Sequence, residues 1–392
     1  MVRINAKLDP TKTGRDAEYL EASLRKLIVG QDEAIEQIVN IYQMHSTGMN
    51  APGRPVGTFL FLGPTGTGKT RIVEATAECL VRNPRAVIKI DCGEFQHSHE
   101  IAKLIGSPPG YLGHRETHPL LSQEVLNQFH TDRCKISFVL FDEIEKASDA
   151  LWNLLLGILD KATLTLGDNR KVDFSRALIF MTSNVGAAEM SAILNPKVGF
   201  ASPHRAEMES GAVGDKTKRK VSNSGIEAAR RKFPPEFVNR ADKIVVFKPL
   251  GQDQLRRVLD IELGMVQQRV FDSSGVNAFV FSPTDSAKDY LLKEGTDVKY
   301  GARPLKRAIE KLLVHPMSNL IATDQVRGGD MVRVDFDGDD GKLVFLKEAE
   351  GMPPHYMQQI TAASLNALNG ATGLLLNEEN ARVAARGGRK NL

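Results

Sequence analysis

The chain has 392 residues, enough for two or three domains with cores of their own. Its hydrophobic share of 42%, charged share of 25% and net charge of +3 are ordinary for a globular protein and argue against binding nucleic acid or a membrane through charge. The three cysteines lack close pairing, residues 1–7 contain no apolar signal region, and no apolar run approaches a membrane span. We therefore expect a cytoplasmic protein without a disulfide framework.

The first part of the chain predicts an α/β domain. Continuous apolar runs separated by segments of helical period are typical of a parallel sheet with helices on both faces. We therefore expect a five-stranded parallel sheet. The five runs are residues 58–62, 86–90, 136–141, 177–181 and 243–247.

The loop after the first run fits the phosphate-binding pattern G-x-x-x-x-G-K-[ST], in which backbone N–H groups curl around a polyphosphate. Lys69 is expected to reach the outer phosphates, and the Thr70 hydroxyl to bind Mg²⁺. A helix over residues 71–81 would aim its N-terminal dipole at the phosphates. The sequence therefore predicts a nucleotide site with Mg²⁺. The loop reads Gly63, Pro64, Thr65, Gly66, Thr67, Gly68, Lys69 and Thr70.

Two later strands end in polar side chains. The third run ends at Asp142 and Glu143, and we expect Asp142 to hold Mg²⁺ or its water while Glu143 polarises the water that attacks the γ-phosphate. The alternative is an ordinary acidic turn at a strand end. Asn184, after the fourth run, is placed to contact the γ-phosphate or the attacking water, although serine and asparagine end many strands.

The pattern changes at residue 249. Helices are expected over residues 252–269, 285–294 and 304–322, followed by two short strands over 331–336 and 342–346. These elements predict a small α+β domain. Residues 201–225, with a basic run at 216–220, read as a solvated loop, and residues 351–392 as a helical or disordered tail. The spacing of His97, His99, His114 and His118 beside Cys92 matches no zinc pattern.

Four segments carry a family resemblance: LIGSPPGYLG at 104–113, FDEIEKA at 141–147, PEFVNR at 235–240 and YGARPL at 300–305. Together with the phosphate loop they resemble the Clp family of AAA+ protein unfoldases, and more narrowly the second, C-terminal ATPase module of the two-ring members. The resemblance runs from about residue 17 to about residue 346. It implies a leader helix (1–27), a large AAA+ P-loop ATPase domain (28–249), a small lid domain (250–350) and the tail (351–392).

The resemblance also implies roles for single residues. Ile28 and Val29 fall on the segment that holds the adenine, and Asn184 falls on the first sensor. Arg240 falls on the arginine finger, which reaches the ATP of the neighbouring subunit, and Arg303 falls on the second sensor. A guanidinium suits both roles because it contacts phosphate bidentately.

Further implied features concern polypeptide binding. Tyr111 and Leu112 match the family's pore loop, where an aromatic ring on a glycine hinge grips a chain without reading its sequence. Residues 165–170 match a second axial loop. After residue 113 the chain departs from the family, because HRETHP replaces an acidic residue and a glycine pair. Val198, Gly199 and Phe200 stand where peptidase-linked members carry a docking loop, or they form a locally packed loop.

The resemblance implies an ATPase that threads polypeptides through the pore of a homohexameric ring, using ATP and Mg²⁺. One alternative is an unfoldase that feeds a Clp-type peptidase. Another is a nucleotide-switched assembly factor for one dedicated partner. A nucleic-acid motor is disfavoured, because no basic stripe with interleaved aromatic residues is present.

Overall fold

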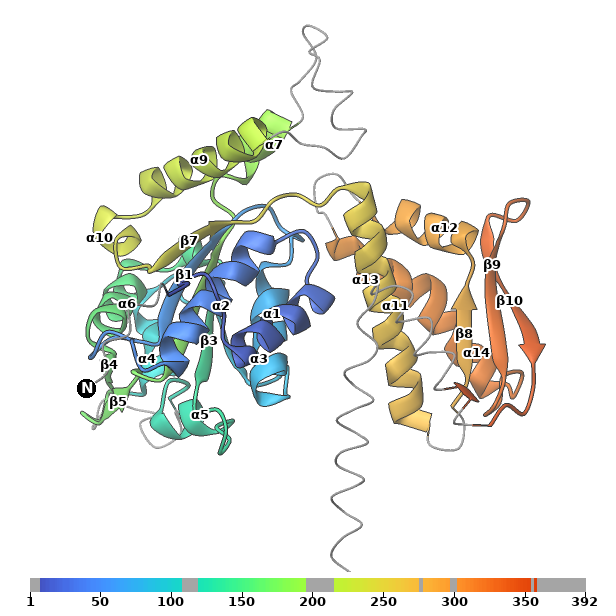
Figure 1. The fold of residues 1–392 in the computed structure, drawn as a ribbon, viewed down its shortest axis with the longest axis horizontal. Helices are drawn as coiled ribbons and strands as arrows, with labels where there is room; N and C mark the ends of the chain where they lie inside the picture. Colours follow the sequence, from blue (N-terminus) through green and yellow to red (C-terminus); the bar gives the residue numbers. More distant parts are fainter. Residues whose placement is uncertain are drawn as a thin grey trace, which may run out of the picture. The chain divides into compact units, whose positions relative to one another are not determined.

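The computed structural model describes residues 8–107, 119–194, 215–274, 278–296, 302–353 and 356–357. The chain divides into two compact units, Met1–Pro249 and Leu250–Leu392, whose elements are labelled in Figure 1. Among the described helices, none combines the length and the apolar character that a membrane crossing requires.

The first unit is built on a five-stranded sheet with the order β2-β3-β6-β1-β7. All four strand pairs are parallel, as the continuous apolar runs predicted. Every residue of β1 and β6 is buried, because helices cover both faces of the sheet. The strands are β1 Gly57–Leu62, β2 Val87–Asp91, β3 Ser137–Asp142, β6 Ala177–Ser183 and β7 Lys243–Val246.

Alternate side chains of β1 enter two separate cores. Phe59 and Phe61 pack with the apolar sides of α1 Arg15–Leu27, α2 Asp32–Ser46 and α3 Lys69–Val81. These three helices lie on one side of the sheet in Figure 1. Because side chains alternate along a strand, the remaining apolar residues of β1 face the opposite core.

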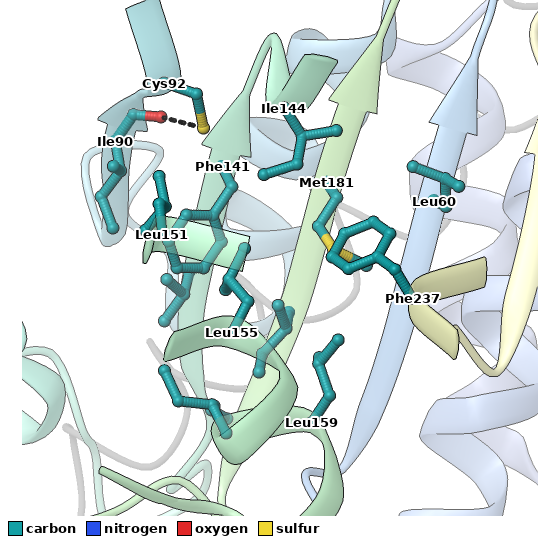
Figure 2. Packing of buried hydrophobic residues seen from close by; sticks show 14 of the residues in the cluster. Leu60, Ile90, Cys92, Phe141, Ile144, Leu151, Leu155, Leu159, Met181 and Phe237 are labelled. Atoms are coloured by element: carbon teal, nitrogen blue, oxygen red, sulfur yellow. Dashed lines mark hydrogen bonds between the residues drawn. The ribbon is translucent and has the colours of Figure 1, made fainter. Parts of the chain in front are cut away.

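The opposite core is shown in Figure 2, where Leu60, Phe141 and Met181 from three strands face Leu155 of α6 Asp149–Lys161 and Phe237 of α10 Pro235–Val238. The two cores fix the sheet from both sides. The carboxyl ends of its strands, where the phosphate-binding loop begins, are thereby held on a rigid base.

The remaining elements complete the first unit. The strands β4 Thr163–Thr165 and β5 Lys171–Asp173 form an antiparallel hairpin. The expected second axial loop, residues 165–170, therefore lies largely in the turn of a hairpin. The other elements are η1 Cys92–Glu94, η2 Ser98–Ile101, α4 Ala102–Ile105, α5 Gln123–Asn127, η3 Ile144–Lys146, α7 Ala187–Leu194 and α9 Asp215–Lys232.

The expected solvated loop over residues 201–225 was wrong in its second half. Helix α9 begins at Asp215 and includes the positions of the basic run. Its later residues Val221, Ala228 and Ala229 are buried, so the helix is anchored by a narrow apolar side while its basic residues give it a polar composition.

The second unit packs helices against a three-stranded sheet of order β10-β9-β8. The expected hairpin is present as antiparallel β9 Met331–Asp337 and β10 Lys342–Ala349, and β8 Val280–Pro283, which the sequence analysis missed, adds to β9 in parallel. The expected helix over 304–322 is interrupted by a π-turn at Glu310–Val314. The helices are α11 Gln252–Ser274, α12 Asp285–Gly295, α13 Arg303–Ile309 and α14 His315–Ala322.

Candidate functional site

The loop between β1 and α3 requires glycine at its first position. Gly63 has a φ of 143°, and a Cβ there would lie 2.5 Å from the carbonyl oxygen of Phe247. Gly66 and Gly68 also have positive φ values, 75° and 96°. Only glycine adopts such angles without strain, so the glycines of the motif are explained by backbone geometry.

The loop leads directly into α3, and the first turn of this helix is accessible to an anion. Gly68 is the N-cap residue and, as a glycine, has no side chain with which to cap the helix. Among the described residues, apart from its chain neighbours and the nearby backbone of α3, no heavy atom lies within 4 Å of the position that a Cβ of Gly68 would take. The first-turn N–H groups of a helix carry partial positive charge, so this end of α3 fits a phosphate group.

Lys69 is folded back into the loop. Its Nζ donates hydrogen bonds to the carbonyl oxygens of Gly63 (2.6 Å) and Pro64 (2.9 Å) and to Oδ1 of Asn184 (3.0 Å). Burial lowers the pKa of Lys69 to about 8, opposed by nearby carboxylates, of which Glu145 acts most strongly. A buried ammonium of lowered pKa is best satisfied by an anionic partner, which suits a phosphate site.

Asp142 is held at the end of β3 by a neighbouring strand. The hydroxyl of Thr182 on β6 donates to Oδ1 of Asp142 and accepts the N–H of Glu143 at 3.1 Å. Oδ2 of Asp142 lies 3.5 Å from Oγ1 of Thr70. A carboxylate beside a hydroxyl is the oxygen donor set that Mg²⁺ prefers, so these two residues fit the ion.

Glu143 has a strained backbone, with a φ of 56° in the left-handed region. Its Oε1 accepts a hydrogen bond from Nδ2 of Asn184 at 3.1 Å, and its Oε2 pairs with Lys146. The backbone N–H of Asn184 donates to Oε1 of Glu145 at 3.0 Å. Asn184 therefore links Lys69 of the loop to Glu143 through the two ends of one amide.

Arg240 lies away from this group of residues. Its carbonyl oxygen lies 3.1 Å from the hydroxyl oxygen of Thr58, near the start of β1, whereas the loop follows the end of that strand. Its guanidinium pairs with Asp160 at 2.6 Å. The structure thus brings together Lys69, Thr70, Asp142, Glu143 and Asn184, and it leaves Arg240 outside this group.

The other expected site residues have separate positions. Ile28 and Val29 are both 6% exposed, and Ile28 packs in the core beside α1 and α2. Arg303 is the first residue of α13 in the second unit. The expected pore-loop residues, Tyr111 and Leu112, and the expected docking loop at 198–200 lie outside the described residues.

Sequence reasoning missed several residues that position this site. Thr182 and Glu145 stand inside or beside quoted motifs, so proximity in the sequence was the available signal. The pairing of Lys146 with Glu143 could have been predicted, because residues three positions apart lie close together on a helical turn. The pairing of Asp160 with Arg240 joins residues far apart in the chain, and no sequence pattern signals it.

Two family models match the chain. Residues 54–244 match the AAA domain described as the Cdc48 subfamily, and residues 250–334 match the C-terminal, D2-small domain of ClpB protein. The matches meet near the boundary between the two compact units.

Curated relatives include the chaperone protein ClpB of Bdellovibrio bacteriovorus, 38% identical over 82% of this chain and 34% of the relative. ClpB 1 of Thermosynechococcus vestitus is 37% identical over 85% of this chain and 35% of the relative. The chloroplastic ClpC3 of Oryza sativa subsp. japonica is 36% identical over 85% and 34%. The chain thus spans about a third of the length of these relatives.

Solved structures of Hsp104 are also similar. A closed-state reconstruction with ATPγS and FITC-casein matches with a TM-score of 0.67 and 28% identity, over 85% of this chain and 52% of that one. The S. cerevisiae Hsp104–casein complex in an extended conformation matches with a TM-score of 0.69 and 27% identity, over 86% and 53%. The similarity therefore extends across both compact units.

Proposed function

The chain belongs to the Clp family of AAA+ proteins, and from this premise we propose that it hydrolyses ATP with Mg²⁺ to unfold or remodel other proteins. The observation that carries the ATPase part is the link from Lys69 through Asn184 to Glu143, with contacts of 3.0 and 3.1 Å. This link joins Lys69, which is suited to binding phosphate, with Glu143, which is suited to activating the attacking water.

Each residue of the site has a distinct task in this proposal. The loop N–H groups and Lys69 bind the phosphates, and Thr70 and Asp142 hold Mg²⁺, which neutralises charge on the phosphate oxygens. Asn184 positions the Glu143 carboxylate, which accepts a proton from the attacking water. The ion pair with Lys146 helps to hold the Glu143 carboxylate in place.

The remaining site assignments rest on the family. We assign Ile28 and Val29 to the adenine, and Arg303 to sensing nucleotide from the lid domain. The location of Arg240 supports its role as a finger for a neighbouring subunit, because its backbone is tied to the far end of β1 from the loop. A head-to-tail interface of this kind closes into a ring, and we propose a homohexamer.

The polypeptide part of the proposal draws on the relatives. Two similar Hsp104 structures are complexes with casein, and Tyr111 with Leu112 matches the family's pore loop. We propose that this chain binds unfolded polypeptides through that loop. A second candidate function is the delivery of unfolded chains to a Clp-type peptidase that binds Val198, Gly199 and Phe200. Only the position of these three residues in the sequence favours it.

The test separates nucleotide binding, hydrolysis and polypeptide capture. Glu143→Gln should bind ATP, hydrolyse it at least about a hundredfold more slowly, and hold FITC-casein in its presence. The double variant with Tyr111→Ala should bind ATP equally and lose the casein. Glu94→Gln, at an exposed acidic position, should match the unaltered protein.

Two results would overturn the proposal. Full hydrolysis by Glu143→Gln would remove the catalytic assignment. If Glu143→Gln with ATP captured one defined protein from host extract, with or without Tyr111, the chain would be an assembly factor rather than a threading machine. A broad set of polypeptides that is lost with Tyr111→Ala supports threading.

A further inference from the structure

The side chain of Gln31 joins two segments that are distant in the sequence. Gln31 is the N-cap residue of α2, yet its side chain makes no capping hydrogen bond to that helix. Instead Nε2 donates to the carbonyl oxygens of Thr67 (3.1 Å) and Lys248 (2.9 Å), and Oε1 accepts the N–H of Lys248 (3.2 Å). These partners lie 36 and 217 positions away along the chain.

The amide of Gln31 is buried, with only 4% of the residue exposed. Its Nε2 group uses both of its N–H donors and its Oε1 is also occupied, so the contacts satisfy groups that would be costly to leave unpaired away from water. A planar amide of this kind holds its partners at a fixed separation. Thr67 belongs to the phosphate loop, and Lys248 immediately precedes the boundary of the second unit at Pro249.

The other end of the loop also contacts the segment containing Lys248. The N–H of Phe247 donates to the carbonyl oxygen of Leu62 at 2.7 Å. The carbonyl oxygen of Phe247 leaves no room for a side chain at Gly63. Residues 247–248 are therefore tied to the loop at its start directly and at Thr67 through Gln31.

We propose that Gln31 is a positioning residue that couples the conformation of the phosphate loop to the peptide leading into the second unit. The inference rests on the proposed function only in that a nucleotide is the ligand that changes the loop. When phosphates bind and the Thr67 peptide adjusts, the Gln31 amide moves with it, and its two bonds to Lys248 carry the adjustment to residues 247–249.

The alternative is that Gln31 only fills a buried polar position. That role predicts a loss of stability on substitution, and it predicts no change in how residues 247–250 respond to nucleotide. The response of this segment to a ligand bound elsewhere therefore separates the two roles.

The experiment is hydrogen exchange of the full chain with and without ATPγS and Mg²⁺, read at the loop and at residues 247–250. In the unaltered protein, both segments should change when ATPγS is added. Gln31→Ala and Gln31→Glu should keep the change at the loop, with affinity for ATPγS within about tenfold, and should lose most of it at residues 247–250. Gln37→Ala, on the same helix with a buried Oε1 that has no hydrogen-bond partner among the described residues, should respond as the unaltered protein does.

Each other outcome has a definite meaning. Equal responses at residues 247–250 in the unaltered protein and both Gln31 variants would overturn the coupling. Loss of ATPγS binding in both variants would make Gln31 a support of the loop alone and would also overturn it. Absence of any loop response in the unaltered protein would be a failure of the proposed function instead.

Discussion

Nη1 of Arg240 lies 2.6 Å from Oδ1 of Asp160 in the same chain. The two side chains are 34% and 27% exposed, and an ion pair with this access to water is worth only ~0.2–1 kcal/mol. In the proposed ring, Arg240 could therefore leave this pair for a phosphate of a neighbouring subunit at little cost.

A mixing experiment tests this finger. Arg240→Ala keeps an intact hydrolytic residue but offers its neighbour no guanidinium, whereas Glu143→Gln has the opposite defect. Each variant alone should hydrolyse ATP at least about a hundredfold more slowly than the unaltered protein. Random one-to-one mixing should restore activity, at most to about a quarter of the normal rate, because a quarter of the interfaces then combine both intact residues.

Asp160→Asn serves as the matched control. Because the pair is weak, this variant alone should change the rate by no more than about fivefold. A mixture of Arg240→Ala with Glu143→Gln that stays inactive, while the two proteins assemble together, would contradict a finger supplied in trans.

Asp242 should be important for the stability of the first unit. Its Oδ2 accepts both the N–H and the hydroxyl of Thr58 at 2.8 Å, and Thr58 is only 1% exposed. Asp242→Ala leaves a buried N–H without this partner, which should cost about 1–3 kcal/mol. Urea unfolding followed by Trp152 fluorescence measures this loss, and Asp132→Ala, at an exposed turn, should be neutral within about 0.5 kcal/mol.

We expect Gly167 to be more important for the unfolding of polypeptide substrates than for ATP hydrolysis. Its N–H donates to the carbonyl oxygen of Ile105 at 2.8 Å, and a Cβ at this position would lie 2.4 Å from the carbonyl oxygen of Gly106. Gly167→Ala therefore forces the hairpin turn between β4 and β5 away from the end of α4.

We expect Gly167→Ala to lower the rate at which the protein unfolds a fluorescent model substrate roughly tenfold or more. A small displacement of the hairpin turn would move its side chains away from the positions in which they contact the substrate. The ATPase rate should stay within about threefold. Gly157→Ala is the control, since no atom of the described residues, outside its chain neighbours and the nearby backbone of α6, lies within 4 Å of the Cβ position. Equal losses of unfolding and hydrolysis would assign Gly167 to the stability of the fold instead.

Asp335 should make the second unit sensitive to acid. Hydrogen bonds from Thr284, Ser286 and the N–H of Phe336 lower the pKa of Asp335 to about 2 from its ordinary 3.8. Because the folded-state pKa is the lower one, the stabilisation is complete above about pH 4 and is lost as the pH falls through 2.

Asp335→Asn should therefore unfold at a lower urea concentration than the unaltered chain at pH 7, and the difference should shrink below pH 4. Pulsed hydrogen exchange of β9 peptides follows this unit alone. Asp340→Asn, in the exposed turn between β9 and β10, should show no such difference. A gap in urea midpoint that stays constant down to pH 2.5 or so would mean that the carboxylate charge is not the cause.

The central sheet could be predicted from the sequence because both of its faces are buried. Apolar runs such as residues 58–62 and 177–181 need no knowledge of their partners to be recognised as strands. Strand β8 was missed since its four residues are defined mainly by pairing with β9. Helix α9 was missed over residues 215–225 because its basic positions conceal the few buried ones.

The same contrast holds within the candidate site. Asp142 and Glu143 follow an apolar strand directly, so local sequence indicates them. The partners of Gln31 and Arg240 are set by tertiary contacts, with Lys248 lying 217 positions from Gln31. Such pairs depend on how the sheet brings distant segments together, which a local pattern does not encode.

At position 143 the backbone conformation and the side chain favour different residues. The left-handed backbone lowers the stability of a protein with glutamate there, whereas the proposed hydrolysis needs the glutamate carboxylate. A φ of 56° at a residue with a Cβ costs about 1–2 kcal/mol relative to the right-handed region, and glycine or asparagine would relieve part of this strain. Neither residue carries a carboxylate. Laboratory evolution for heat resistance alone should therefore enrich glycine or asparagine at position 143, and under the proposed mechanism the resulting, more stable proteins would bind ATP without hydrolysing it.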